Sequence, residues 1–376
     1  MNVSQRVISL SVFFFFLVST YFFISNSNRI KIKNLTFLYI CILSIMAYFY
    51  VPYKTADLYR IFEQIDIYYS HLSFSEFLEW AFKINTNIVS MLYYYLFAKI
   101  GLYHLLPLTN CFIFYYIIFK IYNNFVENSE ILKKDAGIVF MIVMAGGQYI
   151  EVISGIRFML AASIFIFCLY REFFKEKNII SDIPLYLAST LIHISLSIPI
   201  IFRIVFKIFQ GESNSLKKIF GVVLSLGMLV FIYFFGSNFM NYVFESGYKY
   251  ISTDSYSYFW EYLIAIINMY YLYLVYKTVK KINYEKYKKY YNYEKFIFVF
   301  FIFTLIMFPT YSIFHRFRTI VWFLNIPNFV FLFEGLRKNN NSSHNKNVYS
   351  ITMLILFITY ILIFTRGNLC GLNFFK

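Results

Sequence analysis

The sequence predicts an all-α fold: a single polytopic integral membrane domain, residues 1–376, with about 11 to 12 transmembrane helices. Of the 376 residues, 60% are hydrophobic and only 14% are charged, whereas soluble domains carry roughly 25% charged residues. Several apolar runs reach the roughly 18–20 residues that a helix needs to cross a bilayer. Composition and run length together exclude an ordinary soluble domain.

The expected spans follow one another along the whole chain. The first contains "SVFFFFLVST" and is not followed by a small-residue cleavage site, so we interpret it as a retained helix rather than a signal peptide. The spans are expected near residues 7–25, 35–52, 86–106, 108–123, 136–150, 156–172, 183–203, 219–236, 258–276, 296–314, 319–335 and 349–365. Two hydrophilic segments interrupt this series, at 53–85 and at 277–295.

These two hydrophilic segments carry opposite net charges. Residues 53–85 hold five acidic and three basic residues, a net charge of −2, and residues 277–295 hold seven lysines and two glutamates, a net charge of +5. Because cytoplasmic loops are enriched in Lys and Arg, 277–295 is predicted to be a basic cytoplasmic loop. The larger hydrophilic loop 53–85 lies on the outer face or on the cytoplasmic face, depending on whether 86–106 spans the membrane.

The basic loops place two arginine-containing segments on the same side. The span after the basic loop leads outward, so "HRFR" at 315–318 is expected at the outer face. The basic segment "YREFFKEKN" at 170–178 is also expected in the cytoplasm, which puts Arg157, one span earlier, at the outer face. Two separate local arguments therefore bring these arginines to one face.

The charge pattern leaves one alternative open around 183–203. The stretch 202–218 is basic and is expected in the cytoplasm, yet only one apparent span separates it from the cytoplasmic 170–178. Either the rule that positive loops lie inside fails once, or 183–203 is re-entrant or broken, as Pro184 and Pro199 permit.

Arg157 stands against the start of an apolar run, in "EVISGIRFMLAAS". An arginine costs roughly 2.5–3.5 kcal/mol at the centre of an inserted helix and less near its end. One interpretation is a side chain that snorkels to the lipid headgroups, and Glu151 is a candidate ion partner. The other is an anion clamp, because the guanidinium fork matches the oxygens of a phosphate.

His193 lies in the middle of the apolar stretch "ASTLIHISLSIPI". A single histidine in such a run is often hydrogen-bonded to a neighbouring serine or threonine. An ionisable residue within a span is also a candidate functional group, and imidazole suits a general base near neutral pH. Both interpretations stay open on the sequence.

Two further groups of charged residues are candidates for binding phosphate or sugar. Arg316 and Arg318 are two positions apart in "YSIFHRFRTIVWF", so on a helix one is expected to face the headgroups and the other the interior. Asp57 and Arg60 lie among aromatic residues in "TADLYRIFEQID", a composition that suits carbohydrate binding but also an ordinary solvated loop.

Several function classes are excluded or disfavoured. The net charge of +15 does not indicate nucleic-acid binding, because the basic residues lie in short clusters between apolar runs. No nucleotide-binding, metalloprotease or serine-hydrolase motif occurs, and the four cysteines form no CxxC pair. We therefore expect no metal site and no cofactor.

With these residues identified, the chain resembles the EpsG family, which belongs with the Wzy-type O-antigen and capsule polymerases. The resemblance is strongest in "SGIRFMLAASIFIFCLYREFFKEKNIISDIPLYLASTLIHISLSIPI", where family-like positions are held by Arg157, Ala161, Ala188, His193 and Ser195. "ADLYRIF" resembles the acidic-loop signature and "HRFR" resembles the late arginine region. The chain departs from the family in "VPYKTAD", which lacks the usual Gly and Arg, and at Phe158, where a Gln is common.

The resemblance implies a metal-independent polymerase at the outer face of the bacterial cytoplasmic membrane. Its partners would be undecaprenyl-diphosphate-linked glycans, membrane lipids, a flippase and a chain-length regulator. Arg157, with Arg316, Arg318 and Arg60, would bind the diphosphate or the sugar. His193 or Asp57 would take the proton of the attacking hydroxyl. A lipid-linked oligosaccharide flippase, a membrane O-acyltransferase of surface glycans and a non-enzymatic channel or scaffold are the rival readings.

Overall fold

A computed structural model describes residues 3–27, 29–54, 56–84, 88–146, 149–175, 179–210, 255–308, 311–339 and 342–370. Every regular element in these ranges is a helix. In chain order they are α1 (Val3–Asn26), α2 (Arg29–Tyr48), α3 (Asp57–Gln64), the π-helix η1 (Ile65–Tyr69), α4 (Phe74–Ile84), α5 (Ile88–Ile100), α6 (Leu105–Glu127), α7 (Lys133–Gly146), α8 (Tyr149–Ser154), α9 (Ile156–Phe174), α10 (Ile179–Ile192), the 3₁₀-helix η2 (Ile194–Leu196), α11 (Ser197–Gln210), α14 (Ser255–Ile282), α15 (Tyr284–Lys289), α16 (Tyr291–Ile306), α17 (Tyr311–Leu324), α18 (Ile326–Lys338) and α19 (Ser342–Cys370). The span expected near 219–236 lies outside the described residues.

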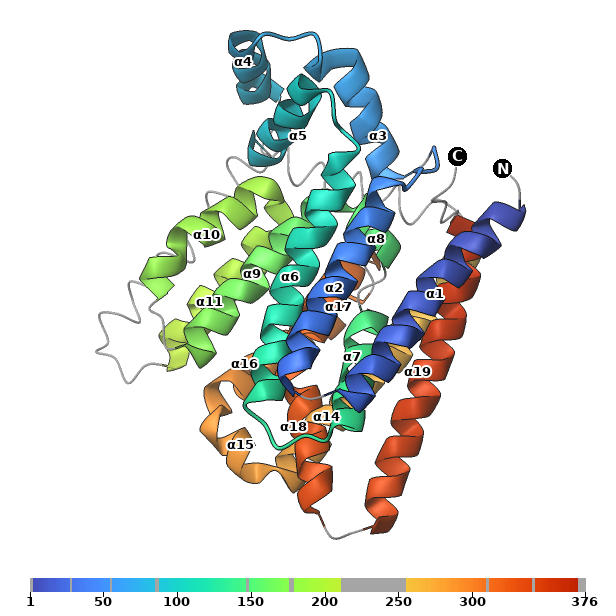
Figure 1. Cartoon of the computed structure of the whole chain (residues 1–376). Helices are drawn as coiled ribbons and strands as arrows, with labels where there is room; N and C mark the ends of the chain where they lie inside the picture. Colours follow the sequence, from blue (N-terminus) through green and yellow to red (C-terminus); the bar gives the residue numbers. More distant parts are fainter. Residues whose placement is uncertain are drawn as a thin grey trace.

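The long helices form an elongated bundle with two distinct ends (Figure 1). Helix α6 packs against α2 and α9, α9 packs against α10, and α1 packs against α7 and α19. Helices α3, α4 and α5 gather beyond the bundle at the top of Figure 1, and α15 lies at its opposite end. We call these the α3–α5 end, residues 57–100 and the helix ends beside them, and the α15 end, residues 284–289 and the helix ends beside them.

The chain is an all-α protein with helices that suit a membrane. Among the described residues, three helices are long and apolar enough to cross a bilayer: Val7–Asn26, Lys31–Tyr48 and Leu105–Glu127. A fourth span is added if the bent pair Ile313–Leu324 and Ile326–Lys338 is counted as one. Many of the other helices are shorter; α7, for example, has 14 residues, about 21 Å against the roughly 30 Å of a hydrocarbon core.

The apparent span 183–203 is two helices joined by a turn. Helix α10 ends at Ile192, and α11 starts at Ser197. Arg171 near the end of α9 pairs with Asp182 in the first turn of α10 at 3.1 Å. Glu172, the next residue of α9, pairs with Arg203 of α11 at 2.6 Å. Both outer ends of the hairpin therefore lie beside the C-terminal end of α9, so the broken alternative is confirmed and a single crossing is wrong.

Breaks also shift the boundaries of the two spans expected at 296–314 and 319–335. Helix α16 ends at Ile306, and the segment from Tyr311 to Lys338 is one helix pair bent by 45° at Asn325. Pro327 lies at the start of α18. Proline cannot donate its backbone nitrogen and its ring crowds the carbonyl four residues earlier, which accounts for the bend.

The hydrophilic segment 53–85 is largely helical rather than an extended loop. Its helix α3 is amphipathic, with Leu58, Ile61 and Phe62 buried, while Asp57 and Arg60 on the other face are exposed. The apolar face holds this segment against the bundle, with α3 packed on α8. Because α8 directly precedes α9, this packing brings α3 toward the start of α9.

Candidate functional site

Arg157 is the second residue of α9, and its position favours an anion. The N-cap residue of the helix is Gly155, which has no side chain to cap the first backbone N–H groups. Unsatisfied N–H groups and the helix dipole attract negative charge at a helix start, so a cation placed there adds to the same positive potential. Arg157 itself makes no hydrogen bond or ion pair with any residue that the structure describes.

The charge of this arginine reaches two tyrosines from the α3–α5 end, Tyr69 and Tyr94. Burial raises the pKa of the Tyr69 hydroxyl to about 12, and the positive charge of Arg157 acts in the opposite direction. The same charge reaches Tyr94, which is only 3% exposed. The Tyr94 hydroxyl is buried without a hydrogen-bond partner among the described residues. A guanidinium and a buried phenol, neither with a hydrogen-bond partner among the described residues, therefore lie within electrostatic range of each other.

Phe158 joins the start of α9 to two other candidate residues. Its ring lies 5.6 Å from the ring of His193 in an edge-to-face arrangement. The Arg316 guanidinium lies 5.7 Å from the Phe158 ring centroid, a cation–π distance. The charges of Arg157 and Arg316 both reach the His193 imidazole. Four residues from three separate helical segments thus form one cluster.

His193 forms the break between α10 and α11. Its extended backbone ends the helix, and its Nδ1 accepts a hydrogen bond from the Ser195 backbone N–H at 3.3 Å. The Ser195 hydroxyl lies 2.7 Å from the same nitrogen. The expected hydrogen bond to a neighbouring serine is therefore present. Because Nδ1 is the acceptor, the proton of a neutral ring lies on Nε2, which then acts as a donor.

Glu151 is the partner of His315. Its Oε1 lies 2.9 Å from His315 Nε2, and His315 Nδ1 lies 3.1 Å from an Nη of Arg318. The suggested ion pair between Glu151 and Arg157 is therefore wrong. Arg318 is only 4% exposed, so it is the interior member of the arginine pair. This chain of contacts ties α17 to α8, the short helix that precedes α9.

Asp57 and Arg60 lie at the outer edge of the cluster. They stand in the first turn of α3, 3.5 Å apart, with side chains that are 50% and 64% exposed. The charge of Asp57 reaches Tyr94, the tyrosine that also faces Arg157. The structure thus brings Arg157, His193 and Arg316 together and adds Asp57 through Tyr94, while Arg60 is on the solvent side and Arg318 on the interior side.

Phe158 in the cluster and Tyr94 beside it were not singled out on the sequence. Phe158 was noted only as a departure from the family pattern, although that departure itself marked the position. Tyr94 had no distinguishing signal, because it is one of 37 tyrosines. Its importance comes from burial beside charged groups, and that arrangement is visible only in three dimensions.

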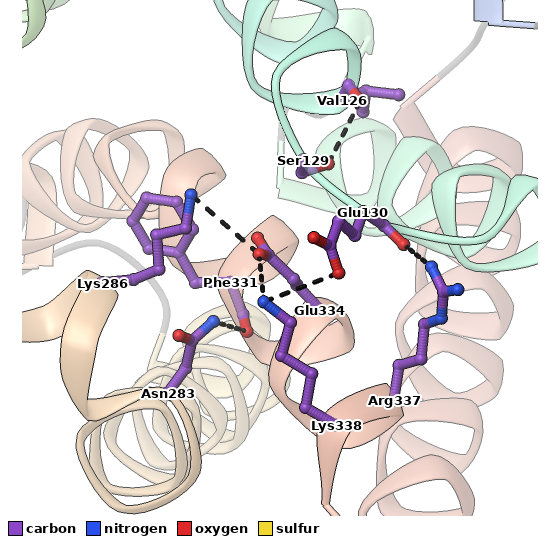
Figure 2. Close-up of polar contacts among 9 residues, drawn as sticks. All are labelled: Val126, Ser129, Glu130, Asn283, Lys286, Phe331, Glu334, Arg337 and Lys338. Carbon is purple, nitrogen blue, oxygen red and sulfur yellow. Dashed lines mark hydrogen bonds and ion pairs between the residues drawn. The ribbon is translucent and has the colours of Figure 1, made fainter.

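Charged residues near the other end are engaged with one another. Arg203 donates to both Glu172 oxygens, from Nε at 3.0 Å and from Nη2 at 2.6 Å. Figure 2 shows a second group, in which Lys286 and Lys338 approach the buried Glu334 at 3.9 Å and 3.2 Å. These pairs fasten helix ends to one another and have the geometry of structural contacts.

Metal binding and known relatives give no further guide. The part of the chain that the structure describes contains no group of three or more His, Cys, Asp or Glu side chains placed to hold a metal ion. Comparison of the chain with protein-family models, with curated proteins and with solved structures finds no match. The function is therefore argued from the cluster around Arg157.

Proposed function

We propose that this protein polymerises undecaprenyl-diphosphate-linked oligosaccharide repeat units into O-antigen, capsule or exopolysaccharide. The observation that carries the proposal is Arg157, a cation at a helix start with no ion pair among the described residues, in one cluster with Arg316 and His193. A diphosphate linked to a lipid would supply the missing counter-charge and is consistent with a chain of apolar helices. The resemblance in "SGIRFMLAAS" and "LIHISLS" points to the same chemistry.

The charge distribution supports an outer-face site in the bacterial cytoplasmic membrane. The +5 segment 277–295 forms the end of α14, α15 and the start of α16. The α10–α11 hairpin returns Arg203 and Lys207 to Glu172 at the C-terminal end of α9, so the charge rule no longer conflicts there. We therefore place the α15 end in the cytoplasm and the Arg157 cluster outside. On this proposal the shorter apolar helices also lie in the membrane, giving about 11 to 12 membrane helices.

The chemistry then follows from the positions of the side chains. A sugar hydroxyl of the acceptor attacks the anomeric carbon of the donor, and the bond from that carbon to the diphosphate oxygen breaks with its electron pair. Arg157 and Arg316 stabilise the negative charge that grows on the diphosphate. The hydroxyl proton passes to the Asp57 carboxylate.

The proposal gives His193 a different role from that of the general base suggested by the sequence. With Nδ1 accepting from the Ser195 backbone N–H, its Nε2–H is available to donate to a diphosphate oxygen. The proposal therefore gives the base role to Asp57 and a donor role to His193. Arg318 acts at a distance, because it contacts His315 on the same helix, and His315 in turn joins α17 to Glu151 of α8.

The test is the length of the surface polysaccharide in a deletion strain. The strain is complemented with wild type, Arg157→Ala or the control Arg337→Ala, which removes an arginine from the other end of the bundle, at matched membrane abundance. We expect a single-repeat product in the deletion, and a full ladder on gels with wild type and with the control but not with Arg157→Ala. An unchanged ladder in the deletion contradicts polymerisation, and loss of the single-repeat product indicates a flippase or an earlier step.

A further inference from the structure

An open pocket of about 410 Å³ lies at the α15 end, between the last turns of α14, helix α15 and the first turns of α16. It is far from the Arg157 cluster, since α15 and the α3–α5 end lie at opposite ends of the bundle (Figure 1). Its lining consists of lysines, tyrosines and two apolar residues: Tyr276, Lys280, Tyr284, Tyr287, Lys288, Tyr291, Lys295, Phe298 and Val299. No acidic residue contributes to this lining.

Three lysines make the pocket strongly positive. Lys280, Lys288 and Lys295 come from three successive helices and are all exposed. None of them makes an ion pair with a residue that the structure describes. Lys286 of the same short helix differs, because it pairs with Glu334 at 3.9 Å, as Figure 2 shows. The chain thus neutralises one lysine of this segment and leaves three facing one cavity.

The pocket also has a fixed aromatic wall. The hydroxyl groups of Tyr276 and Tyr287 lie 3.0 Å apart, and the Tyr276 ring stacks on Phe298 with centroids 4.7 Å apart. Lys280 Nζ lies 5.6 Å from the Tyr287 ring centroid. At the rim, Tyr284 and Tyr291 expose about half of their surface. Tyrosines with an apolar body and a polar tip are typical of the membrane–water boundary.

We propose that this pocket binds the phosphate headgroup of an anionic phospholipid. Lysine ammonium groups bind phosphate as point charges, and basic pockets between helix ends on the cytoplasmic side suit acidic lipid headgroups. Phe298 and Val299 provide apolar surface for the glycerol and upper acyl carbons. A soluble phosphate shares the headgroup chemistry but has no part that would use this apolar surface.

The test measures lipid retention by the purified full-length protein. Native mass spectrometry is used with phosphatidylglycerol or phosphatidylcholine added to the detergent micelle, and Lys280→Gln/Lys288→Gln/Lys295→Gln is compared with wild type. We expect phosphatidylglycerol affinity to fall on the order of 100-fold, which is about 3 kcal/mol at 1.4 kcal/mol per tenfold and matches about 1 kcal/mol per lysine. Phosphatidylcholine binding should not change.

A matched control removes the same charge beside the pocket. Lys277→Gln/Lys281→Gln/Lys289→Gln changes three exposed lysines of the same basic segment that do not line the pocket, and it should keep most of the affinity. Equal losses in the two triple variants would overturn the proposal in favour of diffuse charge attraction. Displacement of the lipid by inorganic pyrophosphate at similar concentration would overturn it in favour of a soluble phosphate. If the triple variant misfolds, the single variant Lys288→Glu gives an independent check. It places a negative charge at the pocket, which repels the phosphate and should weaken phosphatidylglycerol binding.

Discussion

The two ends of the bundle use buried and half-buried charge in opposite ways. Near the C-terminal end of α9, Arg203 and Glu172 are 4% and 6% exposed and hold each other in a bidentate pair. At the N-terminal end of the same helix, Arg157 is half-buried and has no ion pair among the described residues. Helix α9 therefore carries Glu172, which binds Arg203 of α11, and about four turns away it carries Arg157, which is available to a ligand.

This difference teaches how to interpret a charge in an apolar chain. A buried ion pair that is broken leaves an uncompensated charge, so its members should matter for stability. An arginine without an ion-pair partner adds little to the free energy of unfolding, and its substitution should weaken binding of the anionic ligand instead. The contrast can be tested by changing each kind of residue and measuring unfolding and activity separately.

The largest effect on stability is expected for the buried ion pair of Glu172 and Arg203, near the C-terminal end of α9. Glu172→Gln removes the carboxylate and leaves the Arg203 guanidinium buried without its counter-charge. We expect the free energy of unfolding to fall by about 3–5 kcal/mol. Thermal unfolding of the detergent-purified protein, followed by intrinsic fluorescence, measures the change. The double variant Glu172→Gln/Arg203→Met should recover most of the loss, and a wild-type midpoint in the single variant would remove the contrast.

For Arg157, at the N-terminal end of α9, the proposed function predicts an effect on polymerisation activity rather than on stability. Arg157→Lys keeps the charge but loses the forked donors, and hydrogen bonds to charged groups contribute about 1.5–3 kcal/mol each. We expect polymerisation of lipid-linked repeat units by the purified protein to slow roughly 10- to 100-fold, with no change in the unfolding midpoint. Arg337→Lys is the matched control. A loss of stability like that of Glu172→Gln would mean that Arg157 is structural as well.

Two glycines, Gly146 and Gly335, allow a comparison of how tightly the helices pack at two places in the bundle. A Cβ at Gly146 would overlap the buried indole ring of Trp322, whereas a Cβ at Gly335 would lie 2.8 Å from Ile282 Cγ1, a side chain that can shift. We expect Gly146→Ala to lower the free energy of unfolding by about 1–3 kcal/mol. Gly335→Ala should be close to neutral, because helix propensity gains about 1 kcal/mol against the tighter contact. Chemical unfolding of both variants under identical detergent conditions compares them, and equal losses would contradict the packing argument.

The smallest effect is expected for the exposed pair of α3. Arg60→Ala removes a surface contact with Asp57, which is worth about 0–1 kcal/mol, so unfolding should barely change. The apparent KM for the lipid-linked acceptor should rise less than about fivefold. A larger rise with unchanged kcat would show that Arg60 binds substrate directly and belongs inside the cluster rather than at its edge.

Much of the fold could be predicted from the sequence, because apolar runs and helices coincide where a run is uninterrupted. The helices α1, α2, α6 and α9 match the expected spans within a few residues. The run 183–203 shows no such interruption in hydrophobicity. At its break His193 has an extended backbone and its ring accepts a backbone hydrogen bond, a local contact that a hydropathy pattern does not reveal. The conflict between the two basic stretches around it was the available signal.

The candidate site was predictable in its residue types but not in its pairings. Arg157, His193 and Arg316 stood out because charge is rare in apolar runs. The contact between Glu151 and His315 joins positions 164 apart in the chain. Sequence spacing offered only the local alternative of Glu151 with Arg157, whereas the packing of α17 against α7 and α9 brings His315 to Glu151.

The α10–α11 hairpin has a consequence for how the chain is threaded during synthesis. Because both of its arms are paired to the C-terminal end of α9, the hairpin adds no net crossing of the membrane in the proposed topology. Every segment downstream keeps the orientation that it would have if the hairpin were missing. On the proposed topology, excision of 179–210 would therefore preserve the sidedness of α14 to α19, whereas loss of one full span before α14 would invert it.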